Sequence, residues 1–186
     1  IGHSMGGCLM LSAFHNHPKK FDYGILSAPM LGFKNESFLR TASSIMNFLK
    51  KDTDYLIGSK PNMGIETPFA ENDLTTDKDR YKRTQMLVRK MPSVRLWGVT
   101  NSFAKAVNKR FKLIRTKKWA EKIKIKILII NNINDKVVCS NKINEMQKRL
   151  ENSQIIEFKE TQHEIFMEKD EFRLKLWDKI EKFLDG

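Results

Sequence analysis

A serine between glycines, close to the start of the chain, has the spacing of a nucleophile turn. Gly2, Ser4 and Gly6 fit the pattern G-x-S-x-G, in which a strand turns sharply into a helix and leaves the serine at the apex. Side chains two residues before and after the serine would collide in such a turn, so we expect glycine to be required at both positions. The N–H of Met5 would then point to where an oxyanion forms. The alternative is a glycine-rich connection with an ordinary surface serine.

A serine nucleophile also needs a base to take its proton and a carboxylate to orient that base. Asp135 follows the apolar run 125–131, and His163 follows the shorter run 154–158. Each therefore comes at the end of a predicted strand, in the order serine, acid, histidine. Alone, Asp135 could be a turn residue and His163 a surface residue that caps the last helix. Together with Ser4 they predict a catalytic triad. The four histidines and two cysteines have no metal-ligand spacing, so we expect no metal and no cofactor.

The elements that must position these residues alternate between strands and helices at both ends of the chain. The predicted strands are 23–28, 125–131 and 154–158, and the predicted helices are 5–17, 140–150 (with Ser140 as its cap) and 168–184. The run 125–131 has no polar alternation, which is typical of a parallel strand buried on both faces. Between these ends lie amphipathic pieces at 36–50, 81–90 and 102–119. We predict an α/β protein with core segments 1–30 and 125–186, a mostly helical cap insertion over 31–124, and one structural domain overall.

Charge is concentrated in that insertion. The segment from Lys78 to Lys126 holds 17 Lys and Arg against Asp79 and Glu121, a net +15 in a chain of net +12. The excess is either a solvated face or an attraction to anionic lipid surfaces. A nucleic-acid partner is not expected, because charge alone permits it but no recognition motif is present. An apolar stripe in the same segment could pack in a core, roof an acyl pocket or enter a lipid interface; it consists of Phe103, Val107, Phe111 and Ile114.

Compartment signals in the sequence are few. No apolar run approaches the roughly 20 residues of a membrane span, and no secretory signal pattern is present. Cys8 and Cys139 have no context of a disulfide framework and are interpreted as reduced thiols. We expect a cytoplasmic protein, with a peripheral position at the inner face of the membrane as an option.

Several stretches resemble the lysophospholipase L2 and monoacylglycerol lipase branch of the α/β-hydrolases, also known as serine aminopeptidase S33 or Hydrolase-4. In the core these are 2–7, 16–18, 27–30, 134–138 and 162–173, and in the insertion 72–81 and 92–100. The resemblance implies the α/β-hydrolase fold, a triad on Ser4, Asp135 and His163, and an oxyanion donor at Met5 N–H. It also implies a helical cap that forms an acyl pocket and hydrolysis of a lysophospholipid or monoacylglycerol ester. The strand that leads into the serine turn and the second oxyanion donor are expected before Ile1, so the chain is expected to be the C-terminal portion of such an enzyme, with its N-terminal strands missing.

Two alternatives stay open at this point. The chain could be a truncated, non-catalytic fragment of the fold, or its acyl transfer could act on peptides, because a Ser-His-Asp triad does not reveal the leaving group. The sequence does not predict an oligomeric state.

Overall fold

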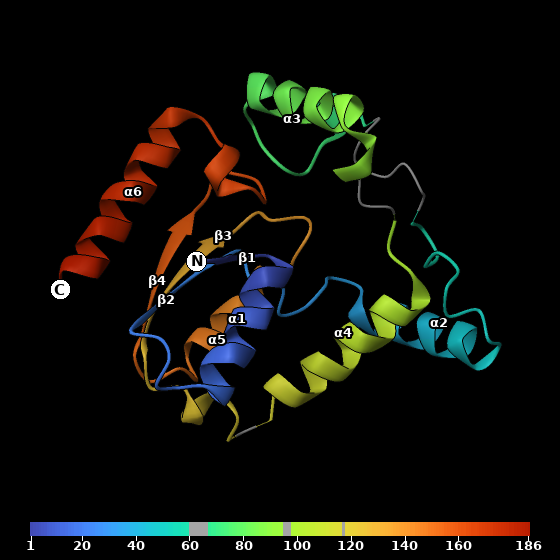
Figure 1. Cartoon of the computed structure of the whole chain (residues 1–186), viewed down its shortest axis with the longest axis horizontal. Helices are drawn as coiled ribbons and strands as arrows, with labels where there is room; N and C mark the ends of the chain where they lie inside the picture. Colours follow the sequence, from blue (N-terminus) through green and yellow to red (C-terminus); the bar gives the residue numbers. More distant parts are fainter. Residues whose placement is uncertain (60–66, 95–97, 117) are drawn as a thin grey trace. The chain divides into compact units, whose positions relative to one another are not determined.

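The computed structural model describes residues 1–59, 67–94, 98–116 and 118–186 (Figure 1). These residues divide into two compact units. The sheet unit comprises 1–34, 73–77 and 113–186, and the helical unit comprises 35–72 and 78–112. The helical unit is thus shorter than the expected insertion over 31–124, because residues 73–77 and 113–124 make their contacts within the sheet unit.

The sheet unit contains a four-stranded parallel sheet in the order β1-β2-β3-β4. Its strands are β1 (Gly2–His3), β2 (Tyr23–Ser27), β3 (Lys126–Asn132) and β4 (Ser153–Phe158). One row of the register runs from Gly2 through Leu26 and Ile129 to Ile155. The predicted parallel pairing is confirmed, and the carboxyl ends of all four strands meet at one edge of the sheet.

Helices cover both faces of this sheet: α6 (Asp170–Asp185) lies on one face, and α1 (Met5–Asn16) and α5 (Ser140–Gln147) lie on the other (Figure 1). All of β3 after Lys126 is buried, as the unbroken apolar run predicted. Side chains on one face of β2 and β3 pack against the apolar face of α6, which consists of Phe172, Leu176, Ile180 and Phe183. Each such side chain stabilises the fold by about 1.5–3 kcal/mol when fully buried.

The start of α5 differs from the prediction. Ser140 is the first helical residue, and the position before it is Cys139, which has an extended backbone and donates its N–H to Gly32 O at 2.9 Å. The helix therefore begins where this backbone bond anchors the chain, without a side-chain cap. Cys8 and Cys139 are both free thiols.

The helical unit consists of α2 (Glu36–Phe48), α3 (Lys78–Lys90) and most of α4 (Asn101–Ile114), with short 3₁₀ turns at Phe69–Glu71 and Pro92–Val94. Two further 3₁₀ turns, at Ala120–Lys122 and Ile165–Met167, belong to the sheet unit. Within the helical unit, Asn101 donates its side-chain amide to Lys51 O and Asp54 O, and Tyr81 donates its hydroxyl to Thr67 O at 2.8 Å.

The apolar stripe of α4 is mostly buried. Val107 is 7% exposed, Phe111 1% and Ile114 0%, whereas Phe103 is partly exposed. Burial of this kind favours core packing over insertion into a lipid interface. Residues 95–97 of the similar stretch 92–100 lie outside the described residues. None of the helices described is both long and apolar enough to cross a bilayer.

Candidate active site

Ser4 connects β1 directly to α1 in a conformation that side chains rarely adopt. Its φ is 50° and its ψ is −118°, so the backbone is strained at this one residue. Three backbone hydrogen bonds maintain the turn. Ser4 N–H donates to Ser27 O at 2.9 Å, and Ser4 O accepts from Met30 N–H at 2.9 Å and from Cys8 N–H at 3.3 Å. The end of β2, the loop after it and the first turn of α1 therefore hold Ser4 in place.

Close packing explains two of the glycines in the turn, though not the pair that we predicted. A Cβ at Gly2 would lie 2.8 Å from the carbonyl oxygen of Gly6, so glycine is required there. A Cβ at Gly6 would meet nothing within 4 Å, and the prediction for that position is wrong. The second tight position is Gly7, where a Cβ would lie 2.8 Å from the Cβ of Pro29. Gly7, the second glycine of α1, therefore packs directly against the loop after β2.

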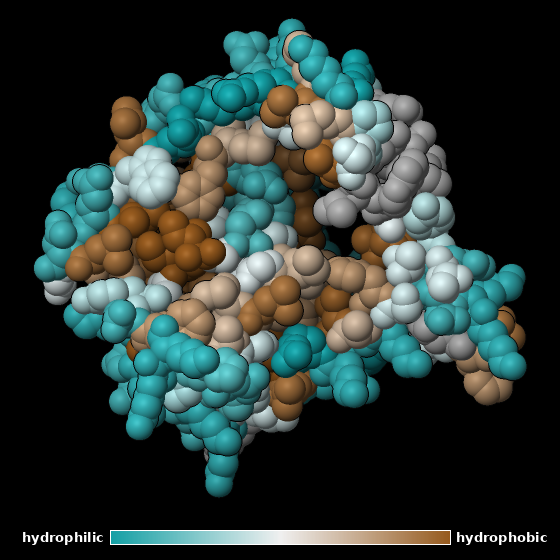
Figure 2. Space-filling model, viewed as in Figure 1, coloured by the Kyte–Doolittle hydropathy of each residue, from teal (hydrophilic) through white to brown (hydrophobic). Residues whose placement is uncertain are grey.

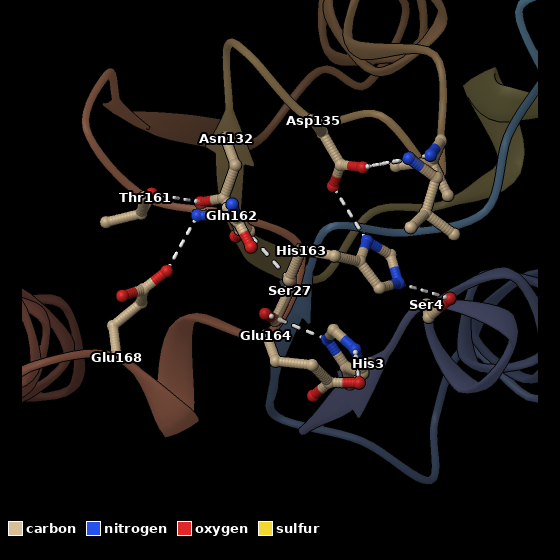
Figure 3. Close-up of polar contacts among 12 residues, drawn as sticks. His3, Ser4, Ser27, Asn132, Asp135, Thr161, Gln162, His163, Glu164 and Glu168 are labelled. Carbon is tan, nitrogen blue, oxygen red and sulfur yellow. Dashed lines mark hydrogen bonds and ion pairs between the residues drawn. The ribbon is translucent and has the colours of Figure 1, made fainter. Parts of the chain in front are cut away.

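The three predicted site residues come together at the carboxyl edge of the sheet (Figure 3). His163 Nδ1 donates to Asp135 Oδ2 at 2.7 Å, and His163 Nε2 lies 2.9 Å from Ser4 Oγ. Asp135 is 2% exposed and His163 3% exposed. With the proton on Nδ1, the imidazole presents Nε2 as an acceptor to the serine hydroxyl.

Hydrogen bonds hold both Asp135 and the loop that carries His163. Asp135 Oδ1 accepts the N–H of Val137 at 2.7 Å and of Val138 at 3.0 Å, which leaves Oδ2 for the histidine. The buried Asn132, the last residue of β3, donates its side-chain amide to Gln162 O and His163 O. Asn132 lies just beyond the predicted strand 125–131, and nothing in the sequence links an amide at that position to a distant histidine.

The structure places Met5 at the first position of α1. The first N–H groups of a helix have no acceptor within it, so the Met5 N–H is available beside Ser4. This is the position that an oxyanion donor requires.

A second carboxylate–imidazole pair, which the sequence reasoning missed, lies beside His163 (Figure 3). His3 Nε2 is 3.0 Å from Glu164 Oε1, and His3 Nδ1 is 3.2 Å from Ser27 Oγ. The rings of His3 and His163 are 4.8 Å apart at their centroids. Burial raises the pKa of Glu164, but the contact with His3 and the charges of His3 and His163 outweigh it and lower that pKa below its ordinary value. The only signal in the sequence was the position of Glu164 directly after the histidine.

Metal binding was considered for the same cluster. Among the residues that the structure describes, it is the one group of His, Cys, Asp and Glu side chains whose ligand atoms lie close enough together to hold a metal ion. His3, His163 and Glu164 each offer a ligand atom, all within 4.8 Å of one another. Those groups already have polar contacts with one another or with Ser4, Ser27 and Asp135. We therefore assign the cluster to hydrogen bonding and charge pairing.

Residues 73–77 hold the loop that carries His163, and this too was missed. Asp73 O accepts the N–H of His163 at 3.3 Å, and Leu74 O accepts the N–H of Glu164 at 2.7 Å. The fully buried Glu168 accepts from Thr76 N–H at 3.0 Å, from the Thr76 hydroxyl, and from Gln162 N–H at 2.7 Å. The histidine loop is thus fixed by a segment about 90 residues earlier in the chain.

The sheet is parallel and covered by helices on both faces. A serine lies on the strand–helix turn, and an acid and a histidine follow later strands. This arrangement defines an α/β-hydrolase fold. The chain belongs to the family of serine aminopeptidase S33, whose sequence profile matches residues 1–170.

Relatives in this family include proteins with lysophospholipase names. The chain is 25% identical over 187 residues to the probable lysophospholipase L2 of Haemophilus influenzae, covering 100% of this chain and 58% of that protein. It is 32% identical over 104 residues to lysophospholipase L2 of Escherichia coli K12, covering 54% of this chain and 30% of that protein.

Solved structures with the same fold include two lipases. The monoacylglycerol lipase of Paleococcus ferrophilus superposes with a TM-score of 0.72 at 22% identity, covering 99% of this chain and 66% of that one. A soluble variant of the monoglyceride lipase of Saccharomyces cerevisiae gives a TM-score of 0.71 at 16% identity, covering 99% and 63%. The chain thus spans between 58% and 66% of the length of the relatives that it matches over its whole extent.

Proposed function

We propose that this protein is a serine hydrolase that cleaves carboxylic esters of lipids by Ser-His-Asp acyl transfer. The observation that carries the proposal is the continuous contact from Asp135 through His163 to Ser4, with distances of 2.7 Å and 2.9 Å. The substrate class is taken from the resemblance to lysophospholipase L2 proteins. A lysophospholipid or a monoacylglycerol is therefore the proposed substrate.

In the first half of the reaction, His163 Nε2 takes the proton of the Ser4 hydroxyl while Oγ attacks the ester carbonyl carbon. Asp135 stabilises the imidazolium that forms, and the N–H of Met5 stabilises the developing oxyanion. The C–O bond to the glycerol-containing alcohol then breaks, and the alcohol leaves with the proton from His163.

In the second half, His163 accepts a proton from water, and the resulting hydroxide attacks the acyl-serine. The bond to Ser4 Oγ breaks, His163 returns the proton to Oγ, and the fatty acid leaves. The proposal needs no metal or cofactor for either half.

Covalent labelling by a fluorophosphonate probe tests the nucleophile directly, because the probe reacts only with an activated serine. We expect stoichiometric labelling of Ser4, lost in Ser4→Ala and retained in Ser12→Ala, a serine of α1 away from the relay. A chain that folds but takes up no probe would support the non-catalytic alternative and overturn the proposal.

A substrate panel then separates the ester and peptide alternatives. We expect turnover of a lysophospholipid, a monoacylglycerol or a short-chain aryl ester, and no turnover of amino-acid arylamides. Preferential cleavage of the arylamides would instead favour a serine aminopeptidase.

For the basic segment from Lys78 to Lys126, we propose peripheral contact with anionic lipid surfaces. The segment is divided between the two units at residue 112, and Arg95 and Lys117 lie outside the described residues. In the helical unit, hydrophilic side chains cover the outer surface of α3 (Figure 2). The same unit exposes apolar side chains on one side of α2: Phe38, Ile45 and Phe48, at 62%, 55% and 87% exposure. Cationic and exposed apolar groups together favour an anionic lipid interface.

Co-sedimentation with phosphatidylglycerol vesicles tests this contact. Each well-placed Lys or Arg contributes about 1 kcal/mol, so replacing Lys82, Arg83 and Arg89 by glutamine should weaken binding roughly 100-fold at low salt. Added salt should weaken wild-type binding in the same way. The matched control replaces three exposed lysines of the sheet unit by glutamine: Lys19, Lys20 and Lys179. Salt-independent binding, or none, would show that the basic segment is only a solvated face.

A further inference from the structure

We propose that Glu164 and His3 form a second charge pair that adjusts the proton affinity of His163. This proposal rests on the proposed role of His163 as the base. It adds two positioning residues, which do not touch the reacting atoms. Figure 3 shows both side chains beside His163, on the side away from Asp135.

The pair joins two distant parts of the sheet unit. His3 belongs to β1 and precedes the nucleophile, whereas Glu164 follows the histidine about 160 residues later. Their side chains meet at 3.0 Å and are about one-quarter exposed, at 25% and 29%. The hydroxyl of Ser27 holds the other nitrogen of His3 at 3.2 Å, and Glu164 N–H is held by Leu74 O at 2.7 Å. Both members are therefore fixed in place by neighbouring strands and loops.

Charge gives this arrangement its effect on His163. An ionised Glu164 stabilises the imidazolium form of His163, which the reaction forms in both halves. A neutral His3 leaves that negative charge uncompensated. A protonated His3 neutralises Glu164 and places a second positive charge in a ring 4.8 Å from the ring of His163. Protonation of His3 thus destabilises the imidazolium form of His163, whereas ionisation of Glu164 stabilises it.

The remaining charged groups around the pair are fixed in sign. Asp135 lies on the far side of the His163 ring, 2.7 Å from Nδ1. Asp73, whose backbone carbonyl holds His163 N–H, pairs with Lys136 at 3.2 Å and so adds little net charge. Glu164 has a lowered pKa and is ionised wherever an ester hydrolase works near neutral pH.

Two conservative variants should therefore move the titration of His163 in opposite directions. Glu164→Gln keeps the size of the side chain but removes the negative charge, so the imidazolium is less stable and the pKa of His163 falls. His3→Gln keeps an amide near Glu164 but cannot carry a positive charge, so the pKa of His163 rises. Partial exposure screens both effects, and we expect shifts of about 0.5–1 pH unit each. Glu160→Gln, on the same loop and exposed, is the matched control.

The measurement is the NMR titration of the His163 ring, which does not depend on turnover. The acidic limb of the pH profile of kcat/KM should follow it, moving to lower pH in Glu164→Gln and to higher pH in His3→Gln. In the double variant the His3 change should give a smaller shift than it does alone, because without Glu164 the protonated form of His3 loses the partner that stabilises it. If Glu164→Gln does not fold, Glu164→Asp, which keeps the charge at a longer distance, should give a smaller fall in the pKa of His163.

Unchanged His163 titration in both single variants, with only lower thermal stability, would overturn the proposal and leave the pair as a structural clamp. Shifts in the same direction would also overturn it. Failure of the proposed function is distinguishable, because it would appear as absent fluorophosphonate labelling of the wild-type chain while the His163 titration still responded to the variants.

Discussion

With Ser4, Asp135 and His163 acting as proposed, asparagine in place of Asp135 should lower kcat by about 10⁴, while the folded chain keeps its stability. The reason lies in how the carboxylate is held. Oδ1 accepts two backbone N–H groups, from Val137 and Val138, so the carbonyl oxygen of an asparagine will take that position. Its NH₂ group must then face His163 Nδ1, which has to become an acceptor. The proton moves to Nε2, and the base can no longer take a proton from Ser4.

The measurement is kcat on an aryl ester, together with thermal unfolding of both proteins. Asp73→Asn is the matched control, since Asp73 lies beside the same loop but pairs with Lys136 through its exposed carboxylate. We expect its kcat to stay within about twofold of the parent. A loss of less than tenfold in a folded Asp135→Asn chain would return Asp135 to the alternative role of a turn residue.

The convergence of Ser4, Asp135 and His163 could be predicted from the sequence because each follows a recognisable local pattern. Ser4 lies in a short motif, Asp135 follows an unbroken apolar run typical of a buried strand, and His163 follows the shorter, partly polar run of β4. Parallel strands bring their carboxyl ends to one edge, so three separate local signals produce one site. The apolar face of α6 follows from the helical periodicity of its apolar residues.

Features set by close approach could not be predicted in this way. The motif predicted that Gly6 is required, yet the structure has open space there and crowds Gly7 against Pro29. That crowding depends on how α1 lies against the loop after β2, which no local pattern specifies. The start of α5 is a similar case, because the bond from Cys139 N–H to Gly32 O joins residues about 100 positions apart and overrides the cap that Ser140 favoured.

The residues around His163 were missed for a related reason. Glu168 and Thr76 are separated by 92 positions, and no local sequence pattern predicts that they are in contact. The sequence placed Glu168 at the start of the predicted helix 168–184, where a glutamate is normally exposed to solvent. Its four hydrogen bonds to residues 76 and 162 become visible only when the segment 73–77 is placed beside the histidine loop.

Glu168 should therefore be among the residues most costly to replace. It is fully buried, and its carboxylate accepts the backbone N–H groups of Thr76 and Gln162. Glu168→Ala leaves those donors without an acceptor, and we expect a loss of about 3–5 kcal/mol in the free energy of unfolding. Glu168→Gln keeps one carbonyl oxygen and should lose less, about 1–3 kcal/mol.

Urea unfolding of the two variants measures the loss, and Glu181→Ala is the control, because Glu181 is an exposed residue of the same α6 helix. Its unfolding free energy should stay within about 0.5 kcal/mol of the parent. The Glu168→Gln chain should also have a lower kcat with little change in KM, since Gln162 immediately precedes His163 and a looser loop misplaces the base. A loss below 1 kcal/mol in Glu168→Ala would mean that water or other backbone groups satisfy these donors, and that residues 73–77 do not depend on Glu168 to hold the histidine loop.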